Sequence, residues 1–190
     1  MAPGESTASK TAPEPLYLVQ RFVNTIDLET GEDELSSPAA LSAWLAGRGL
    51  MDGGGKPGRN ELGRAIDVRE GLRAVLRHNN GLPLEKEAVE RLDRALGGAA
   101  VRVRFGTEGK PELVPDCRGV DGALARLMTI VAGAVESGDW ERLKACPREA
   151  CEWAFYDRSK NRSGRWCSMD SCGNLEKAKA FRERHRGSAA

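Results

Sequence analysis

Four cysteines near the end of the 190-residue chain have the residue type and the spacing of a metal site. They form two close pairs, Cys146 with Cys151 and Cys167 with Cys172, and four residues separate the members of each pair. A segment of fifteen residues joins the two pairs. Four thiolates in this arrangement suit a tetrahedral zinc ion and leave no coordination position open for a substrate. The pattern therefore predicts one structural Zn²⁺, whose binding would drive the folding of this small segment.

Other uses of these thiols remain open from the spacing alone. An iron–sulfur cluster also takes four cysteine ligands, whereas a spacing of four residues disfavours a redox pair of the CxxC type. The fifth cysteine, Cys117, stands apart and is interpreted as a small buried hydrophobe. An odd number of cysteines in a chain without an export signal argues against a disulfide framework.

A basic C-terminal segment suggests a second kind of chemistry, the binding of a polyanion. Residues 141–190 contain twelve Lys or Arg and seven Asp or Glu, although the net charge of the whole chain is only +1. One group of cations lies in the insert between the cysteine pairs, and another follows Cys172 in a predicted helix. On a rigid zinc frame, the two groups could straddle a phosphate backbone. The predicted DNA-binding residues are Arg162, Arg165, Lys177, Lys179, Arg182, Arg184 and Arg186.

Aromatic residues in and after the insert support an alternative interpretation. Trp153, Phe155 and Trp166 lie beside the cysteines, where a zinc frame could present them to another protein. Such a protein–protein interaction module would expose an aromatic patch of roughly several hundred Å². The same rings, together with Tyr156, could instead form a mini-core beside the metal, and the alternation at 153–155 predicts a short strand.

Amphipathic helices in the preceding part of the chain must position this module. Hydrophobic periodicity predicts five such helices, at 16–28, 38–47, 60–78, 84–96 and 121–135. Ser37 is the predicted N-cap of the second helix, with Pro38 in its first turn. Residues 101–105 alternate apolar and basic side chains, which predicts a half-buried strand with 112–115 as its hairpin partner. The predicted fold is mainly α with one small β-hairpin, followed by a treble-clef-like or zinc-ribbon-like module.

We expect three parts in the chain, a flexible tail (1–15), a helical domain (16–138) and a zinc module with a basic C-terminal helix (139–187). No apolar run reaches the roughly 20 residues that a membrane helix needs, and residues 1–15 lack the apolar core of a secretory signal. We therefore expect a cytoplasmic protein without a membrane partner. With two histidines and no GxxxxGK[ST] or GxGxxG motif in a strand–helix setting, we expect no enzyme and no catalytic residues.

Two polar residues of the helical domain are candidates for binding a small-molecule effector. Asn24 lies in the stretch FVNT, and Arg69 interrupts the apolar stripe of the third helix, so both side chains could point inward. A buried polar group must find a partner, which is either another side chain or a ligand.

The C-terminal residues CPREACEWAFYDRSKNRSGRWCSMDSCGN resemble the CGNR zinc-finger family, which is known for its WCSM and CGNR signatures and a basic helix after them. The resemblance spans roughly residues 140–187. RFVNT at 21–25 and SSPAALSAWLAGRGL at 36–50 resemble the ABATE-like domain of stress-induced transcription regulators. Two positions depart from the family pattern: Leu175 replaces the Arg of CGNR, and Arg21 replaces a common acidic residue.

The resemblance implies a cytoplasmic prokaryotic regulator whose finger contacts DNA and whose helical domain senses a ligand. It places the family's zinc ligands on Cys146, Cys151, Cys167 and Cys172. Analogy with other bacterial regulators adds a homodimer. The predicted function is a zinc-dependent DNA-binding transcription regulator, with a zinc-stabilised interaction module as the alternative.

Overall fold

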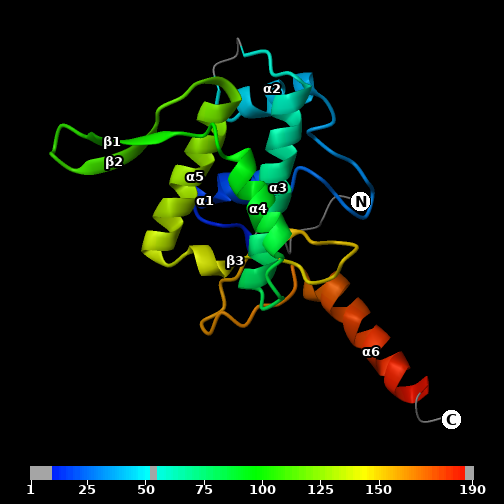
Figure 1. Cartoon of the computed structure of the whole chain (residues 1–190). Helices are drawn as coiled ribbons and strands as arrows, with labels where there is room; N and C mark the ends of the chain where they lie inside the picture. Colours follow the sequence, from blue (N-terminus) through cyan, green and yellow to red (C-terminus); the bar gives the residue numbers. More distant parts are fainter. Residues whose placement is uncertain (1–9, 52–54, 187–190) are drawn as a thin grey trace.

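Six α-helices and two short antiparallel hairpins make up the part of the chain that the computed structural model describes, residues 10–51 and 55–186. Figure 1 shows the helices gathered in one body, from which the β1–β2 hairpin and α6 extend on opposite sides. The elements are α1 (Leu16–Val23), α2 (Pro38–Ala46), α3 (Arg59–Asn79), α4 (Lys86–Ala95), β1 (Val101–Phe105), β2 (Pro111–Pro115), α5 (Gly119–Ser137), η2 (Trp140–Arg142), β3 (Leu143–Ala145), β4 (Ala154–Tyr156), η3 (Met169–Gly173) and α6 (Asn174–Arg186).

Local side-chain chemistry explains where α2 begins. Ala40 N donates a hydrogen bond of 3.1 Å to Ser37 Oγ, and Pro38 occupies the first helical position. The predicted cap is therefore confirmed. The ends of α3, α4 and α5 lie within two residues of the predicted ranges, because their apolar periodicity is long and regular.

The first helix is shorter than predicted. α1 ends at Val23, five residues before the predicted end, because Thr25 Oγ donates back to Phe22 O at 2.9 Å and closes the last turn. Ile26 then forms an isolated antiparallel bridge with Asp33. The chain thus reverses where the apolar spacing alone predicted a further turn of helix.

α1 lies at the centre of the hydrophobic core. Val19, Phe22 and Val23 have no exposed surface, and the helix lies against α3, α5 and β4. The ring of Trp44 from α2 meets Phe22 edge-on, with ring centroids 5.5 Å apart. Burial of these apolar faces around one central helix is the main stabilising contribution to the body.

Part of the predicted N-terminal tail belongs to the folded body. Ala12 is buried in the core, and its backbone N donates to Gln20 Oε1 at 2.8 Å. The prediction of a flexible tail is therefore wrong for residues 10–15, since α1 offers them a buried hydrogen-bond partner. Residues 1–9 lie outside the described part of the chain.

The β3–β4 hairpin carries the hydrophobic core into the zinc module. Leu143 pairs with Tyr156 in an antiparallel register, and both side chains belong to the same core cluster as the helices. Trp153 and Trp166 are only half-buried. The predicted separate aromatic mini-core is therefore wrong, because the helical body already covers the apolar side of the hairpin. The predicted short strand is confirmed as β4.

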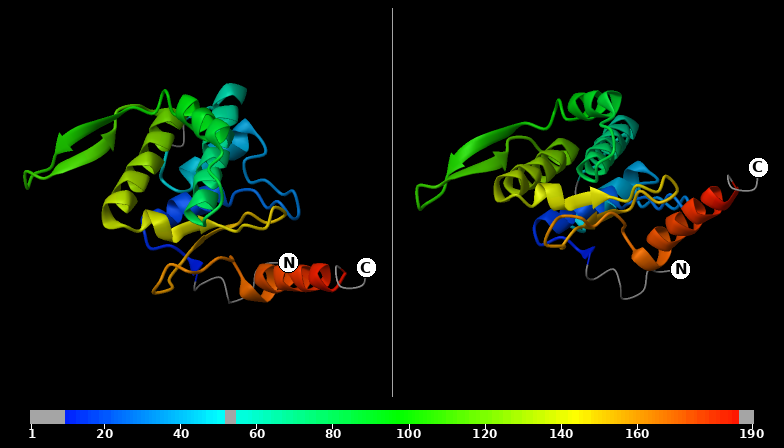
Figure 2. Two further views of the ribbon diagram at one scale, coloured as in Figure 1. Left: turned by 60° about the horizontal axis from the view of Figure 1, so that its bottom comes forward. Right: turned by 90° about the horizontal axis from the view of Figure 1, so that it is seen from below.

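The β1–β2 hairpin lies outside the helical body, as Figure 2 shows from two further directions. Every residue of β1 is exposed, including Val103 at 56% and Phe105 at 69%. The prediction of a half-buried strand is wrong, because only the β2 side of the hairpin lies near α5. The alternation of apolar and basic residues described the two faces correctly but could not show that neither face is covered.

The fold class is confirmed as mainly α, with two small antiparallel hairpins and a C-terminal cluster of four cysteines. Within residues 10–51 and 55–186, no helix has both the length and the apolar character needed to cross a membrane.

Candidate metal centre

Four sulfur atoms converge near the base of α6. The Sγ atoms of Cys146, Cys151, Cys167 and Cys172 all lie within 4.8 Å of one another. Cys167 Sγ lies 3.6 Å from both Cys151 Sγ and Cys172 Sγ. A tetrahedral zinc ion with Zn–S bonds of about 2.3 Å would separate its sulfurs by about 3.8 Å. The four free thiols therefore fit one structural zinc ion, as the sequence predicted.

A tight turn positions the first cysteine pair and brings a cation to the site. Cys151 N donates to Arg148 O at 2.9 Å, which closes the turn. Arg148 Nη1 lies 3.9 Å from Cys172 Sγ and also forms an ion pair with Glu29. Glu29 and, to a lesser degree, Cys172 raise the pKa of Arg148. A cation that donates to a ligating sulfur holds this ligand in its orientation.

The second cysteine pair leads directly into α6. Ser168 Oγ accepts a hydrogen bond of 3.3 Å from Ser171 N, which caps the π-helical turn η3. Cys172 lies buried inside this turn, and α6 begins two residues later at Asn174. A metal ion bound to Cys172 would therefore fix the position of the first turn of α6.

The thiols of Cys146, Cys151 and Cys167 compete for negative charge. Hydrogen bonds from Cys151 and then Cys167 lower the pKa of Cys146 to about 2. The hydrogen bonds with Cys146 in turn raise the pKa of the Cys151 thiol and of the Cys167 thiol above the ordinary value. Sulfurs this close cannot all be thiolates without a cation among them. A divalent ion would remove the competition, which is a further sign that the donor set is built for a metal.

Two amide side chains, Gln20 of α1 and Asn24 at its C-cap, hold the finger against the helical body. Asn24 Nδ2 donates to Ala154 O at 2.9 Å, and Ala154 N donates to Asn24 Oδ1 at 2.7 Å. Gln20 Nε2 donates to the same carbonyl at 3.1 Å. Asn24 thus pairs with β4 much as a neighbouring strand would. All three residues are buried, so these bonds fix the finger on the body.

α3 contributes two arginines to the same junction. Arg73 is 2% exposed and donates to Glu152 O at 3.0 Å and to Val23 O at 2.7 Å. Arg77 forms an ion pair with the Glu152 carboxylate. Burial raises the pKa of Glu152, although Arg77 and Arg73 oppose the shift. Glu152 follows the zinc ligand Cys151 directly, so α3 and the metal site share one network.

A buried ion pair shapes the insert between the cysteine pairs. Lys144 Nζ lies 2.8 Å from Asp157 Oδ2 and also donates to the carbonyls of Arg162 and Gly164, at 2.5 and 3.1 Å. Asp157 accepts hydrogen bonds from the backbone N of Ser159 and of Gly164. Desolvation favours the protonated acid, but the bonds from Lys144 and Ser159 outweigh it and lower the pKa of Asp157 to about 2. The insert is therefore an ordered loop.

Two family models match the chain, and together they cover both halves of this arrangement. Residues 17–137 match the ABATE family, described as "putative stress-induced transcription regulator", and residues 142–185 match the CGNR zinc finger. The ABATE match alone covers more than half of the chain. The chain belongs to the ABATE family. No match was found among curated proteins.

The ABATE and CGNR matches confirm the family resemblance expected from the sequence. The four-cysteine cluster lies inside the CGNR segment and is its zinc-binding site. The two families are described as a transcription regulator and a zinc finger, and neither description names a catalytic activity.

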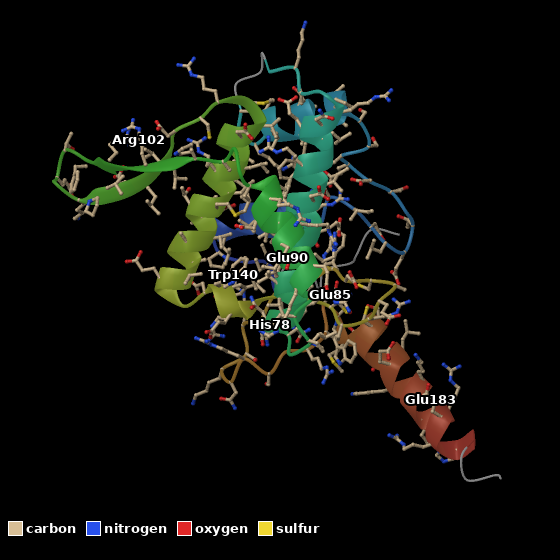
Figure 3. The ribbon with its side chains drawn as sticks, viewed as in Figure 1. His78, Glu85, Glu90, Arg102, Trp140 and Glu183 are labelled. Carbon is tan, nitrogen blue, oxygen red and sulfur yellow. The ribbon has the colours of Figure 1, made fainter. Side chains whose placement is uncertain are left out.

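The predicted DNA-binding residues of the CGNR finger fall into two structural groups. In the insert, Arg162 forms an ion pair with Glu141, and Arg165 lies 5.9 Å from the centre of the Trp166 ring. On α6, Lys177, Lys179, Arg182 and Arg184 are exposed on a helix that packs mainly on η3. Figure 3 labels Glu183, which marks the outer part of this helix. The Arg186 side chain lies outside the described part of the structure.

The two predicted ligand-binding residues of the ABATE domain have partners within the protein. Arg69 is 3% exposed and binds Asp33, at 2.8 Å, as well as Glu70 and Thr25. Asn24 is held by Ala154, as described above. The structure thus gives both residues a role in the fold, and ligand binding by them stays a prediction.

The residues that sequence reasoning missed are buried polar groups: Gln20 and Arg73 join the two matched segments, and Lys144 with Asp157 orders the insert. Gln20, Arg73, Lys144 and Asp157 are polar or charged and buried. Their only sequence signal was a polar residue next to apolar ones, which does not identify its partner. Cys117 lies apart from the cluster, as predicted, but is half-buried rather than buried.

Proposed function

We propose that this chain is a zinc-dependent, DNA-binding transcription regulator of the cytoplasm and not an enzyme. In this proposal the CGNR finger contacts DNA through α6 and the insert, and the metal ion has a structural role only. One observation carries the proposal: α6 is a basic helix that extends beyond the body from a base formed by the zinc ligand Cys172 (Figure 1). A helix held at one end and exposed along its length is suited to contact a duplex.

Three cations of α6 are available for phosphate groups. Among the described residues, none of Lys177, Lys179 and Arg182 forms an ion pair with a carboxylate. Arg162 of the insert, by contrast, already pairs with Glu141. Since a cation without a carboxylate partner breaks no ion pair when it meets a phosphate, α6 is the stronger candidate for the main DNA contact.

The alternative, an aromatic interaction module, receives less support. Phe155 and Tyr156 are 1% and 5% exposed, and Trp153 and Trp166 are half-buried. These rings therefore do not form the exposed patch that docking to another protein would require. The cations of α6 are the more accessible feature of the finger.

Effector sensing by the ABATE domain is the least supported part of the proposal. Asn24 lines a pocket of about 150 Å³ between α1 and the finger, together with Tyr17, Gln20 and Phe155. Small-molecule sites usually enclose about 300–1,000 Å³. Arg69 does not line this pocket. A ligand there would have to be small.

Salt-dependent binding to duplex DNA tests the proposal. We expect the zinc-loaded chain to bind mixed-sequence duplex at about 50 mM salt, with an affinity that falls steeply as salt rises. Replacing Lys177, Lys179 and Arg182 by Ala should make the plot of log K against log salt shallower. The magnitude of its negative slope should fall by about two to three, because each phosphate contact contributes about 0.9.

A matched control removes the same charge from a distant surface. Lys86, Arg91 and Arg94 are exposed cations of α4, and their joint replacement by Ala should leave the slope nearly unchanged. The proposal fails if the wild-type chain does not bind duplex at low salt, or if both triple variants weaken binding equally.

A further inference from the structure

The β1–β2 hairpin has one entirely apolar face that residues 10–51 and 55–186 leave largely exposed. In the antiparallel register, Val101 pairs with Pro115, Val103 with Leu113 and Phe105 with Pro111. Because side chains alternate along a strand, these six residues share one face of the hairpin. The four that are not proline are between 44% and 69% exposed.

The opposite face of the hairpin is charged but balanced. Arg102 pairs with Asp116 at 3.1 Å, and Arg104 pairs with Glu112 at 3.0 Å. At the turn, Lys110 pairs with Glu108 at 3.1 Å. Arg102, labelled in Figure 3, lies on the hairpin away from the helical body. Each of the three cations therefore has a carboxylate partner within residues 101–116, which carry no net charge, so the hairpin offers little attraction to a polyanion such as DNA.

A groove continues the apolar face of the hairpin onto the body. It has a volume of about 640 Å³, and Pro111 and Leu113 of the hairpin form one wall. α5 supplies the other wall with small side chains, including Ala132 and Gly133. Among the described residues, the charged side chains of its lining are Glu14, Glu136 and Asp139, with no Lys or Arg. An anionic occupant would be repelled, whereas a neutral, apolar segment would not.

We propose that this surface binds a second copy of the same chain, with the apolar hairpin face of each copy lying over the groove of the other. A two-fold contact uses the same surface on both partners. Because the face and the groove lie side by side on one chain, the face of each copy can pack on the groove of the other. The hairpin of the second copy is apolar on one face and carries no net charge. Its apolar face therefore places no carboxylate against a groove whose charged side chains are acidic.

The area and the shape of this surface agree with a dimer. The four exposed apolar side chains form one contiguous patch, and contiguous apolar patches mark interaction sites. A stable interface needs about 800 Å² from each partner, and the groove along α5 extends the contact beyond the hairpin face. An isolated two-stranded hairpin is only marginally stable in water, so packing against a second copy would also stabilise the hairpin. Because α6 extends from the opposite side of the body, this contact leaves α6 free (Figures 1 and 2).

Sedimentation equilibrium of the full, zinc-loaded chain without DNA tests the dimer independently of the proposed function. We expect a reversible monomer–dimer equilibrium between about 1 and about 100 µM. The double variant Val103→Asp/Phe105→Asp puts two charges on the apolar face and should weaken association at least about 30-fold. Arg104→Gln, on the opposite face of the same strand, should change the dissociation constant less than about threefold.

Two further measurements accompany this test. Zinc content and far-UV circular dichroism should be the same in all three proteins, because the hairpin lies outside the core. Amides of residues 101–105 should exchange with solvent more slowly as the wild-type concentration rises. A wild-type chain that stays monomeric over the whole range overturns the proposal and leaves the face to a different partner. Dimerisation of the double variant at wild-type strength overturns it as well.

Discussion

The side-chain amide of Asn24 pairs with both backbone groups of Ala154, although 130 residues separate them. Asn24 belongs to the ABATE segment and Ala154 to β4 of the CGNR finger. The two matched segments are therefore joined by buried hydrogen bonds as well as by a shared hydrophobic core. The orientation of α6 consequently depends on the helical body as well as on the metal.

Asn24→Ala should destabilise the junction between the segments. The change leaves the buried N–H and C=O of Ala154 with fewer partners, and an unsatisfied buried group costs about 1–3 kcal/mol. We expect the free energy of unfolding in urea to fall by this amount. Asn60→Ala, at an exposed position of α3, is the control and should change stability by less than about 0.5 kcal/mol. Equal effects of the two substitutions would contradict the role given to Asn24.

Loss of one sulfur donor should abolish stoichiometric zinc binding. For Cys172→Ser we expect less than about 0.2 zinc per chain by elemental analysis, because structural zinc needs its full thiolate set. Cys117→Ser should retain one zinc, since Cys117 lies outside the cluster. A chelator should make four further thiols reactive in the wild-type chain. A Cys172→Ser protein with a full zinc content would rule out the four-sulfur site.

Removing Lys144 should disorder the insert. Lys144→Met leaves Asp157 as a buried charge without its partner, and breaking such a pair costs about 3–5 kcal/mol. We expect lower thermal stability and faster proteolysis within residues 157–164. The double variant Lys144→Met/Asp157→Asn removes both charges and should recover part of the loss. If Lys144→Met is as stable as the wild type, the ion pair does not organise the loop.

Leu175→Arg should strengthen DNA binding, if the proposed function holds. Leu175 is 50% exposed in the first turn of α6, at the position where the CGNR signature has Arg. An added cation there should steepen the salt dependence of log K by about 0.9. Leu175→Gln adds a polar group without charge and should leave the slope unchanged. Identical slopes for the two variants would place Leu175 outside the DNA contact.

Tyr156 gives the protein a pH dependence in the alkaline range. Burial, followed by its 2.5 Å hydrogen bond to Asp139, raises the pKa of Tyr156 from the ordinary 10 to about 12. A raised folded-state pKa contributes stability that is complete below pH 10 and is lost as the pH rises to about 12. The stability difference between the wild type and Tyr156→Phe should therefore shrink across this interval. Phenolate absorbance should show a transition near pH 12 that Tyr156→Phe lacks and Tyr17→Phe keeps.

Local patterns in the sequence were sufficient for the metal site and for most helices. The spacing of Cys146, Cys151, Cys167 and Cys172 reflects the reach of two turns around one ion, which is a local property of the chain. The cap at Ser37 and the apolar periodicity of α3 and α5 are likewise local, since their hydrogen bonds join residues three or four positions apart.

Only the tertiary structure decided which neighbouring element, if any, covers the face of each strand or helix. Periodicity identified the apolar face of 101–105 but could not show that it projects beyond the body. Asn24 was recognised as a polar group that could point inward, yet its partner is a backbone group 130 residues away. Contacts of this kind arise when separate elements pack together, and spacing along the chain carries no record of them. The sequence by itself therefore determined the zinc ligands and most of the helices, and the packing of α1 against β4 and of α3 against β3 decided where the finger lies.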